Sequence, residues 1–192
     1  YKRYNVCGMA PPSSGGVAVI QMLAQLERFN LAQFDPNDLE AVHLFTQSSR
    51  LAFADRNRYI ADSDFVTVPT DELLSSVYLN QRSQLIDPKS DMGKAHAGQV
   101  SQVAYADDNA FELPSTSHIS IVDGDGNAIS MTTSVEMAFG SAVMVNGFIL
   151  NNQLTDFSLA PKRNGQDVAN RVEPFKRPRS SMAPMMVFDN EG

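Results

Sequence analysis

Apolar residues in the first half of the chain recur at three- and four-residue intervals, a spacing that favours amphipathic helices. The first run predicts a helix over about 17–29, which Ser13 or Ser14 is placed to cap. Two later runs predict helices from about 38 to 61 and from about 70 to 86. An Asp-Pro pair ends the last helix, because proline disfavours helical geometry in the residue before it. One face of the middle helix carries Leu39, Val42, Phe45, Ser49, Ala52 and Phe53.

The second half of the chain has a different texture. Residues 87–115 are polar, rich in turn-forming residues and without a period, which is typical of a long irregular loop. Alternation over 118–132, interrupted by two Asp-Gly pairs, predicts a β-hairpin. Further strands are expected near 147–150 and 185–188, with a loop at 159–178 between them. Helices followed by strands indicate an α+β fold.

Composition and charge narrow the class of protein. The chain has 192 residues and a formal net charge of −7, which argues against a nucleic-acid partner because phosphate backbones need a basic face. A hydrophobic content of 43% is typical of globular domains. No apolar run approaches the ~20 residues of a membrane span, and the single Cys7 excludes an internal disulfide framework. Because the chain begins at Tyr1 and stops in a strand-like run, we expect a piece of a longer protein.

Three polar groups could carry chemistry, and the residues alone leave each of them open. In residues 115–118 hydroxyls lie next to a histidine, but neighbours on a strand point to opposite faces, so Ser117 and His118 do not easily serve one site. Residues 151–156 are more typical of a turn that bonds its own backbone than of a binding site. Residues 176–181 could hold an anion or form a solvated loop. The sequence has no metal-ligand spacing and no phosphate-loop pattern, and no metal or cofactor is expected.

Taken together, several motifs resemble the γ-glutamyltranspeptidase family. They are PPSSGG at 11–16, AFADR at 52–56, TSHISIVD at 116–123, FILNNQ at 148–153, DFS at 156–158 and KRPRSSM at 176–182. Each motif is weak alone, but they follow the family's order and span nearly the whole chain. The resemblance implies a partial four-layer αββα N-terminal-nucleophile hydrolase fold. Residues 1–115 would be the end of the large subunit, mostly helical with an irregular loop at 87–115, and 116–192 would be the β-rich start of the small subunit.

The resemblance also implies a self-processing precursor with a threonine nucleophile. Cleavage of the Ser115–Thr116 bond would free the amine of Thr116, whose ordinary pKa of about 8 lets it take the proton of the Thr116 hydroxyl. Thr116 would attack the γ-amide of glutathione or another γ-glutamyl compound, and water or an amino acid or peptide acceptor would resolve the ester. Ser134 matches a position where the family usually has Thr, and its hydroxyl would orient Thr116.

Further residues match those that hold the glutamyl head in the family. Gln153 and Asp156 match the residues that bind the substrate ammonium, and Ser180 and Ser181 match those that bind its carboxylate. Glu136 departs from the pattern, since well-known members have Asn there. Its carboxylate could strengthen ammonium binding or favour a different acyl group. The arginine that pairs with the substrate carboxylate and the glycine pair of the oxyanion hole would lie outside this chain.

Two alternatives stay open. A cephalosporin (glutaryl) acylase-like amidase would share the fold, and Glu136 is the residue that favours it. A non-catalytic binding relative would also share the fold, but the retention of the matching polar residues argues against it. The resemblance further implies a heterodimer of large and small subunits from one precursor, and a periplasmic or extracellular location.

Overall fold

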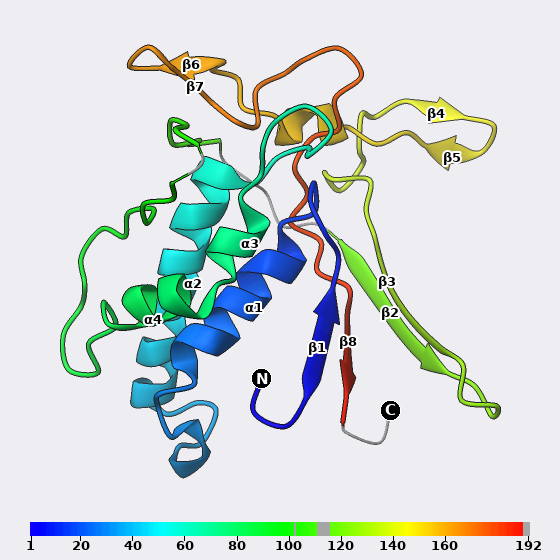
Figure 1. Ribbon diagram of the computed structural model, residues 1–192. Coiled ribbons are helices and arrows are strands. Elements are labelled where there is room, and N and C mark those ends of the chain that lie inside the picture. Colours follow the sequence, from blue (N-terminus) through cyan, green and yellow to red (C-terminus); the bar gives the residue numbers. More distant parts are fainter. Residues whose placement is uncertain (102, 111–115, 190–192) are drawn as a thin grey trace.

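The computed structural model describes residues 1–101, 103–110 and 116–189 (Figure 1). The helices are α1 (Gly15–Leu26), α2 (Leu39–Tyr59), α3 (Thr70–Leu73) and α4 (Ser76–Ser83), with 3₁₀ turns η1 (Leu31–Gln33) and η2 (Gln153–Asp156). The strands are β1 (Asn5–Gly8), β2 (Ser117–Val122), β3 (Ala128–Thr133), β4 (Met144–Val145), β5 (Phe148–Ile149), β6 (Lys162–Arg163), β7 (Gln166–Asp167) and β8 (Met185–Phe188). Among these residues the helices precede all strands but β1, and the fold is partial and α+β, as predicted.

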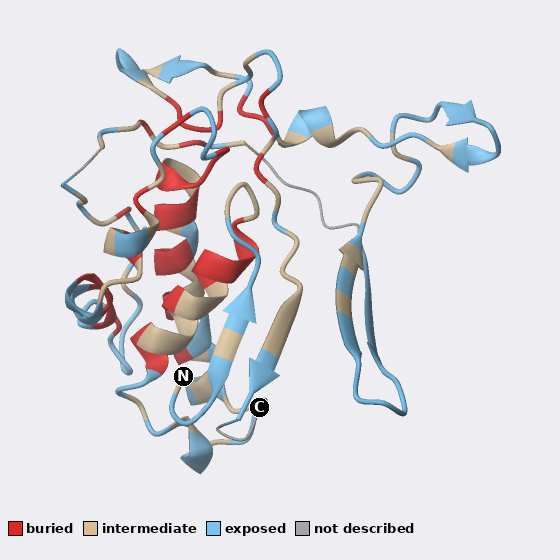
Figure 2. Ribbon diagram, turned by 45° about the vertical axis from the view of Figure 1, so that its right-hand side comes forward, coloured by how far each residue is buried: buried red, intermediate tan, exposed pale blue. Residues whose placement is uncertain are grey.

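Much of the buried core lies between the helices, and a smaller buried group, Ala61, Val66 and Ala169, lies outside them (Figure 2). One cluster joins the four helices to the irregular loop and consists of Val17, Tyr59, Ile60, Leu73, Tyr78 and Ala97. A second cluster lies nearer the C-terminal end of α1 and consists of Leu26, Leu44, Leu51 and Ile86. Burying one large apolar side chain contributes about 1.5–3 kcal/mol, so these clusters give the helical half a core of its own.

The face of α2 that the apolar spacing selects is mostly not the face that the structure buries. Of its six residues only Ala52 is fully buried, while Leu39 and Phe45 are 79% and 56% exposed. The buried face carries Leu44, Gln47, Ser48, Leu51, Ala52, Asp55, Arg56 and Tyr59. Half of these side chains are polar or charged, and they tolerate burial because other segments supply hydrogen-bond partners. For example, the Ser48 hydroxyl donates to Gln25 Oε1 at 3.1 Å.

The prediction of a single helix over about 70–86 is wrong, because the structure has two helices in this range, α3 and α4. The break is at Ser75, which has an extended backbone with φ −66° and ψ 143°. Its hydroxyl oxygen accepts a hydrogen bond from the backbone N–H of Tyr78 at 3.3 Å. Serine is a favoured N-cap because it satisfies a backbone donor of the first turn in this way. The cap at Ser75 begins α4 at a point where the apolar spacing alone predicts that the preceding helix continues.

Strands β2 and β3 form the predicted hairpin, with Ser117 opposite Thr133. Gly126 closes the turn with a φ of +86°, a conformation that favours glycine over residues with side chains. Every residue of β2 is exposed. The hairpin stands apart from the helices in both views (Figures 1 and 2), so the structure leaves both of its faces uncovered.

Other strand pairs were not predicted. β1 pairs antiparallel with the predicted strand β8, which sets Asn5 opposite Phe188 and joins the two ends of the chain. The pairs β4–β5 and β6–β7 are hairpins of two residues per strand, and the second of them lies in the segment predicted as a loop at 159–178. β5 lies within the strand expected near 147–150, whereas β4, β6 and β7 were not predicted, because strands of two residues have no measurable period.

The described parts of the long loop, 87–101 and 103–110, contain no helix or strand, as predicted. The loop is nevertheless attached to the core. The backbone N–H of Gly98 donates to Asp55 Oδ1 at 2.8 Å, and the Tyr59 hydroxyl donates to the carbonyl of Gly98 at 2.6 Å. Across the described ranges, none of the helices combines the length and apolar character that crossing a membrane requires.

Candidate active site

Thr116 and Ser134 lie at the same end of the β2–β3 hairpin. Continuing the antiparallel register by one residue from the pair Ser117 and Thr133 sets Thr116 opposite Ser134. Both residues line a shallow hollow of about 320 Å³, together with Ser117, Thr133, Val135 and Ala138. Thr116 is exposed. The structure therefore brings together the two residues predicted to be catalytic, while Ser115, the other side of the predicted cleavage point, lies outside the described residues.

The turn after β3 holds Ser134 and Glu136 against each other. The backbone N–H of Glu136 donates to Ser134 Oγ at 2.8 Å. Glu136 has a φ of +72°, an uncommon conformation for a residue with a side chain, and such residues cluster at functional sites. Its carboxylate accepts a hydrogen bond from the side-chain amide of Asn152. The negative charge of Glu136 is therefore held in a defined place beside η2.

The 3₁₀ turn η2 is docked on this same turn. The side-chain amide of Gln153 donates to the carbonyl of Ser134 at 3.3 Å. Asn152 forms two further bonds: its backbone N–H donates to the Val135 carbonyl at 3.2 Å, and its Oδ1 accepts from the Met137 N–H at 3.0 Å. Ser134, Glu136 and Gln153 thus form one cluster. Asn152, to which the sequence assigned no role, is the residue that ties it together.

Asp156 closes η2, three residues after Gln153. In a 3₁₀ helix side chains three positions apart eclipse each other, so the amide of Gln153 and the carboxylate of Asp156 share one side of the turn. A carboxylate beside an amide oxygen offers acceptors of the kind that an ammonium group binds. The Asp156 carbonyl also accepts a hydrogen bond from the side chain of Asn170 at 2.7 Å.

Ser180 and Ser181 are held by residues from the other half of the chain. Ser14 donates to the Ser180 carbonyl from its backbone N–H at 2.8 Å and from its hydroxyl at 2.7 Å. The guanidinium of Arg56 donates to Ser181 Oγ at 2.5 Å and to Ser14 Oγ at 2.9 Å. Arg56 is 3% exposed, so a buried cation lies directly beside the serine pair. The sequence placed Arg56 in a motif and gave it no role.

A buried ion pair includes Arg179, the residue directly before Ser180. The guanidinium of Arg179 contacts Asp108 Oδ2 at 3.1 Å, and both side chains are almost completely buried. Asn170 joins the pair, because its side-chain amide donates to Asp108 Oδ2 at 3.3 Å. Asp108 lies 62 positions from Asn170 and 71 from Arg179, and no motif connects the three residues, which explains why the sequence did not reveal the network.

The cationic run at 176–181 has carboxylate partners in the structure. The Lys176 ammonium contacts Glu173 at 2.8 Å, and Arg177 contacts Asp62 at 2.6 Å. The hydrogen bonds from Arg177 lower the pKa of the buried Asp62 carboxyl to about 2. Together with the Arg179 pair, these contacts neutralise the positive charges that could have suggested an anion site. Ser180 Oγ accepts a hydrogen bond from the Met182 N–H at 3.1 Å, and Ser181 Oγ accepts one from the Arg56 guanidinium.

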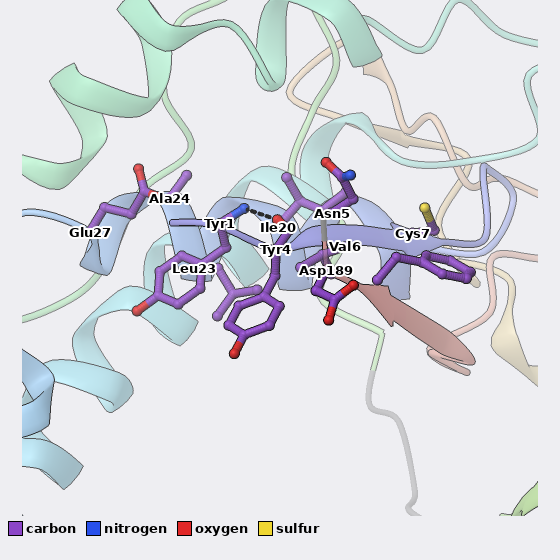
Figure 3. Close-up of a pocket in the computed structure, with 11 residues that line it drawn as sticks. Tyr1, Tyr4, Asn5, Val6, Cys7, Ile20, Leu23, Ala24, Glu27 and Asp189 are labelled. Carbon is purple, nitrogen blue, oxygen red and sulfur yellow. Dashed lines mark hydrogen bonds between the residues drawn. The ribbon is translucent and has the colours of Figure 1, made fainter. Parts of the chain in front are cut away.

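A larger hollow lies elsewhere. Figure 3 shows it between β1 and α1, lined by Tyr1, Tyr4, Asn5, Val6, Cys7, Ile20, Leu23, Ala24, Glu27, Phe188 and Asp189, with a volume of about 1000 Å³. None of the predicted site residues lines it, so size alone is a poor guide to the chemistry here. Within the described part of the chain, no group of three or more His, Cys, Asp and Glu residues could hold a metal ion.

Comparison with known proteins gives consistent results. The family described as Gamma-glutamyltranspeptidase matches residues 1–192. The "Glutathione hydrolase proenzyme" of Bacillus subtilis is 39% identical over 100% of the chain, and the "Acylase ACY 1 proenzyme" of a Pseudomonas strain is 35% identical over 98%. The chain spans 33% and 31% of these relatives. The cephalosporin acylase structure from Bacillus halodurans matches 100% of the chain with 31% of its own, at a TM-score of 0.72 and 23% identity, which shows a shared fold.

Proposed function

Because the chain belongs to the γ-glutamyltranspeptidase family, we propose that it is part of an enzyme that transfers γ-glutamyl groups from glutathione and related compounds to water or to amino acid and peptide acceptors. One observation supports this most directly. Thr116 begins an exposed hairpin and shares a hollow with Ser134, as a nucleophile with an orienting hydroxyl would. No metal or cofactor takes part in the proposed reaction.

In the proposed maturation step one water molecule is consumed as the Ser115–Thr116 peptide bond is hydrolysed, which leaves a carboxylate on Ser115 and an amine on Thr116. The freed amine of Thr116, with an ordinary pKa of about 8, accepts the proton of its own hydroxyl. Thr116 Oγ then bonds to the γ-carbonyl carbon of the donor, the C–N bond breaks, and the proton leaves with the departing amine. Water or an acceptor amine attacks the resulting γ-glutamyl ester and regenerates the threonine. The exposed position of Thr116 leaves room for both donor and acceptor.

The glutamyl head carries an ammonium and a carboxylate, and the proposal assigns separate groups to each. Asp156 and Gln153, on one side of η2, bind the ammonium. Ser180 and Ser181 bind the carboxylate, with the buried Arg56 guanidinium beside Ser181. Paired polar recognition of this kind rejects analogues that lack one of the two groups, because the site's own polar groups are then left without partners.

Residues 1–115 are proposed to end the large subunit and residues 116–192 to begin the small subunit of a heterodimer. The pairing of β1 with β8 and the Asp108–Arg179 ion pair support this, because they join the two parts without the peptide bond between them. A periplasmic or extracellular location is part of the same proposal, by likeness to the family. The alternative of a non-catalytic binding relative is tested by the same experiments as the enzyme.

A glutaryl amidase is the second candidate, favoured by Glu136 and by the likeness to proteins named as acylases. Glutaryl compounds lack the ammonium of γ-glutamyl compounds. The decisive experiment compares kcat/KM of the full-length protein for γ-glutamyl-p-nitroanilide and glutaryl-p-nitroanilide. We expect a preference of at least about 100-fold for the γ-glutamyl compound, since a site built to bond a polar group strongly rejects its absence. A preference for the glutaryl compound would establish the amidase, and no turnover of either would favour the binding relative.

A further inference from the structure

Asn170 lies just beyond β7, and nothing in the sequence singled it out. It is 0% exposed, and a buried side-chain amide is costly unless its donors and acceptor are satisfied. Its partners come from three separate segments of the chain. The positions of these partners therefore show which segments the Asn170 side chain connects.

Each hydrogen bond of Asn170 reaches a different part of the site. Its Nδ2 donates to the carbonyl of Asp156 at 2.7 Å, at the end of η2. The same group donates to Asp108 Oδ2 at 3.3 Å, in the irregular loop. Its Oδ1 accepts from the backbone N–H of Arg179 at 3.0 Å, directly before Ser180. A fourth bond, from the Ser158 N–H to the Asn170 carbonyl at 2.9 Å, fixes its own backbone.

We propose that Asn170 is a positioning residue that sets the spacing between the ammonium-binding and carboxylate-binding parts of the site. This inference rests on the proposed function. The two charged groups of a glutamyl head sit on the same carbon atom, so the protein groups that bind them must keep a fixed separation. One amide, bonded to the Asp156 main chain on one side and to the residue before Ser180 on the other, fixes that separation. Misplacement by about 1 Å can cost a hundred-fold in rate.

The test uses the full-length protein and three anilides that share one leaving group. γ-Glutamyl-p-nitroanilide carries both head groups, glutaryl-p-nitroanilide lacks the ammonium, and 4-aminobutanoyl-p-nitroanilide lacks the carboxylate. The readout is the ratio of kcat/KM for the first compound to each of the other two. A ratio measured on one preparation is independent of the fraction of protein that is folded and cleaved, so a loss of stability alone does not change it.

Asn170→Ala is compared with wild type and with Gln47→Ala. Gln47 is a matched control, because it is also a buried amide, donating to the Asp87 carbonyl at 2.5 Å, and it lies nine residues before Arg56 on α2, outside the proposed site. We expect both ratios to fall about ten-fold in Asn170→Ala and to stay unchanged in Gln47→Ala. If Asn170→Ala does not fold, Asn170→Ser replaces it, since one hydroxyl cannot reproduce both amide bonds, and the same direction is expected.

Unchanged ratios in the Asn170 variants, with active wild type, would overturn the positioning role and leave the proposed function intact. Equal falls in the Asn170 and Gln47 variants would also overturn it, because any buried amide would then have the same effect. If wild type does not turn over the γ-glutamyl compound, the proposed function fails, and the inference fails with it.

Discussion

Arg56 and Ser181 meet across 125 positions of sequence, and their contact joins a helix of the first half to the proposed carboxylate site. The guanidinium donates to oxygens of Ser14, Asn57 and Ser181, among others. A planar fork with several donors can satisfy three acceptors at once, whereas an ammonium cannot copy this geometry. At the residue scale, Arg56 is therefore the side chain that orients the Ser181 hydroxyl.

Replacement of Arg56 tests this role. Arg56→Lys keeps the charge but loses the fork, and we expect KM for γ-glutamyl-p-nitroanilide to rise about ten-fold. The control is Arg58→Lys on the same helix, whose guanidinium contacts Asp107 at 2.6 Å outside the site. Steady-state kinetics of both variants decide the matter, and equal KM values in the two would refute the role of Arg56.

Glu136 supplies a second prediction at this scale. Glu136→Gln removes the negative charge while keeping the size of the side chain. We propose that the Glu136 carboxylate adds to ammonium binding by Asp156 and Gln153, so its loss should lower kcat/KM for γ-glutamyl-p-nitroanilide about ten-fold. Turnover of glutaryl-p-nitroanilide, which has no ammonium, should stay the same. Equal losses for both substrates would instead mean that Glu136 only shapes the turn after β3.

At the scale of elements, local patterns predicted those structures whose cause is local. The β2–β3 hairpin follows from alternation and an Asp-Gly turn, and both are visible in the sequence. The buried face of α2 does not follow from a local pattern, because Ser48 and Asp55 are buried through hydrogen bonds to partners on other segments. Burial even raises the pKa of the Asp55 carboxyl, against the opposing effect of Arg82. Apolar spacing carries no information about such partners.

The cap at Ser75 gives a prediction for one element. Ser75→Ala removes the acceptor for the Tyr78 N–H and should destabilise α4 by about 1 kcal/mol, a typical value for an N-cap. We expect amide hydrogen exchange in the first turn of α4 to become about five-fold faster. Ser76→Ala, at the next and exposed position, is the matched control and should leave exchange nearly unchanged. If exchange is unchanged in Ser75→Ala as well, the break between α3 and α4 has another cause.

At the scale of the whole molecule, contacts between the two halves of the chain create the candidate site. The sequence identified Thr116, Ser134, Gln153, Asp156 and the serine pair through motifs, and the structure brings the first three into one region. The sequence did not identify Asn170 or the Asp108–Arg179 pair. Each of their bonds depends on how distant segments pack, so no local pattern encodes them.

The contact between Asp62 and Arg177 also links the two halves, and it predicts a dependence on pH. An unfolded aspartate has a pKa of about 3.9, whereas Arg177 lowers the pKa of Asp62 to about 2 in the folded protein. The unfolded state therefore takes up the proton first as the pH falls. The stabilisation is complete above about pH 4 and is lost as the pH falls through about 2.

Arg177→Met is the variant that reveals this dependence. We expect its thermal midpoint to lie a few degrees below that of wild type at pH 6. The difference between the two midpoints should become smaller as the pH is lowered from about 5 toward 2. Lys162→Met, which removes an exposed ion pair in the same part of the chain, should differ little from wild type at any pH. A gap that is constant with pH would show that Asp62 is not the group responsible.

Intact mass measurement of the full-length protein shows whether Thr116 is a self-processing nucleophile. Wild type is compared with Thr116→Ala and with Ser120→Ala, which removes an exposed hydroxyl from β2, the strand that directly follows Thr116. We predict that wild type and Ser120→Ala split between Ser115 and Thr116, while Thr116→Ala stays whole. A folded wild-type protein that stays whole, or a Thr116→Ala variant that splits at the same bond, would show that Thr116 is not the self-processing nucleophile.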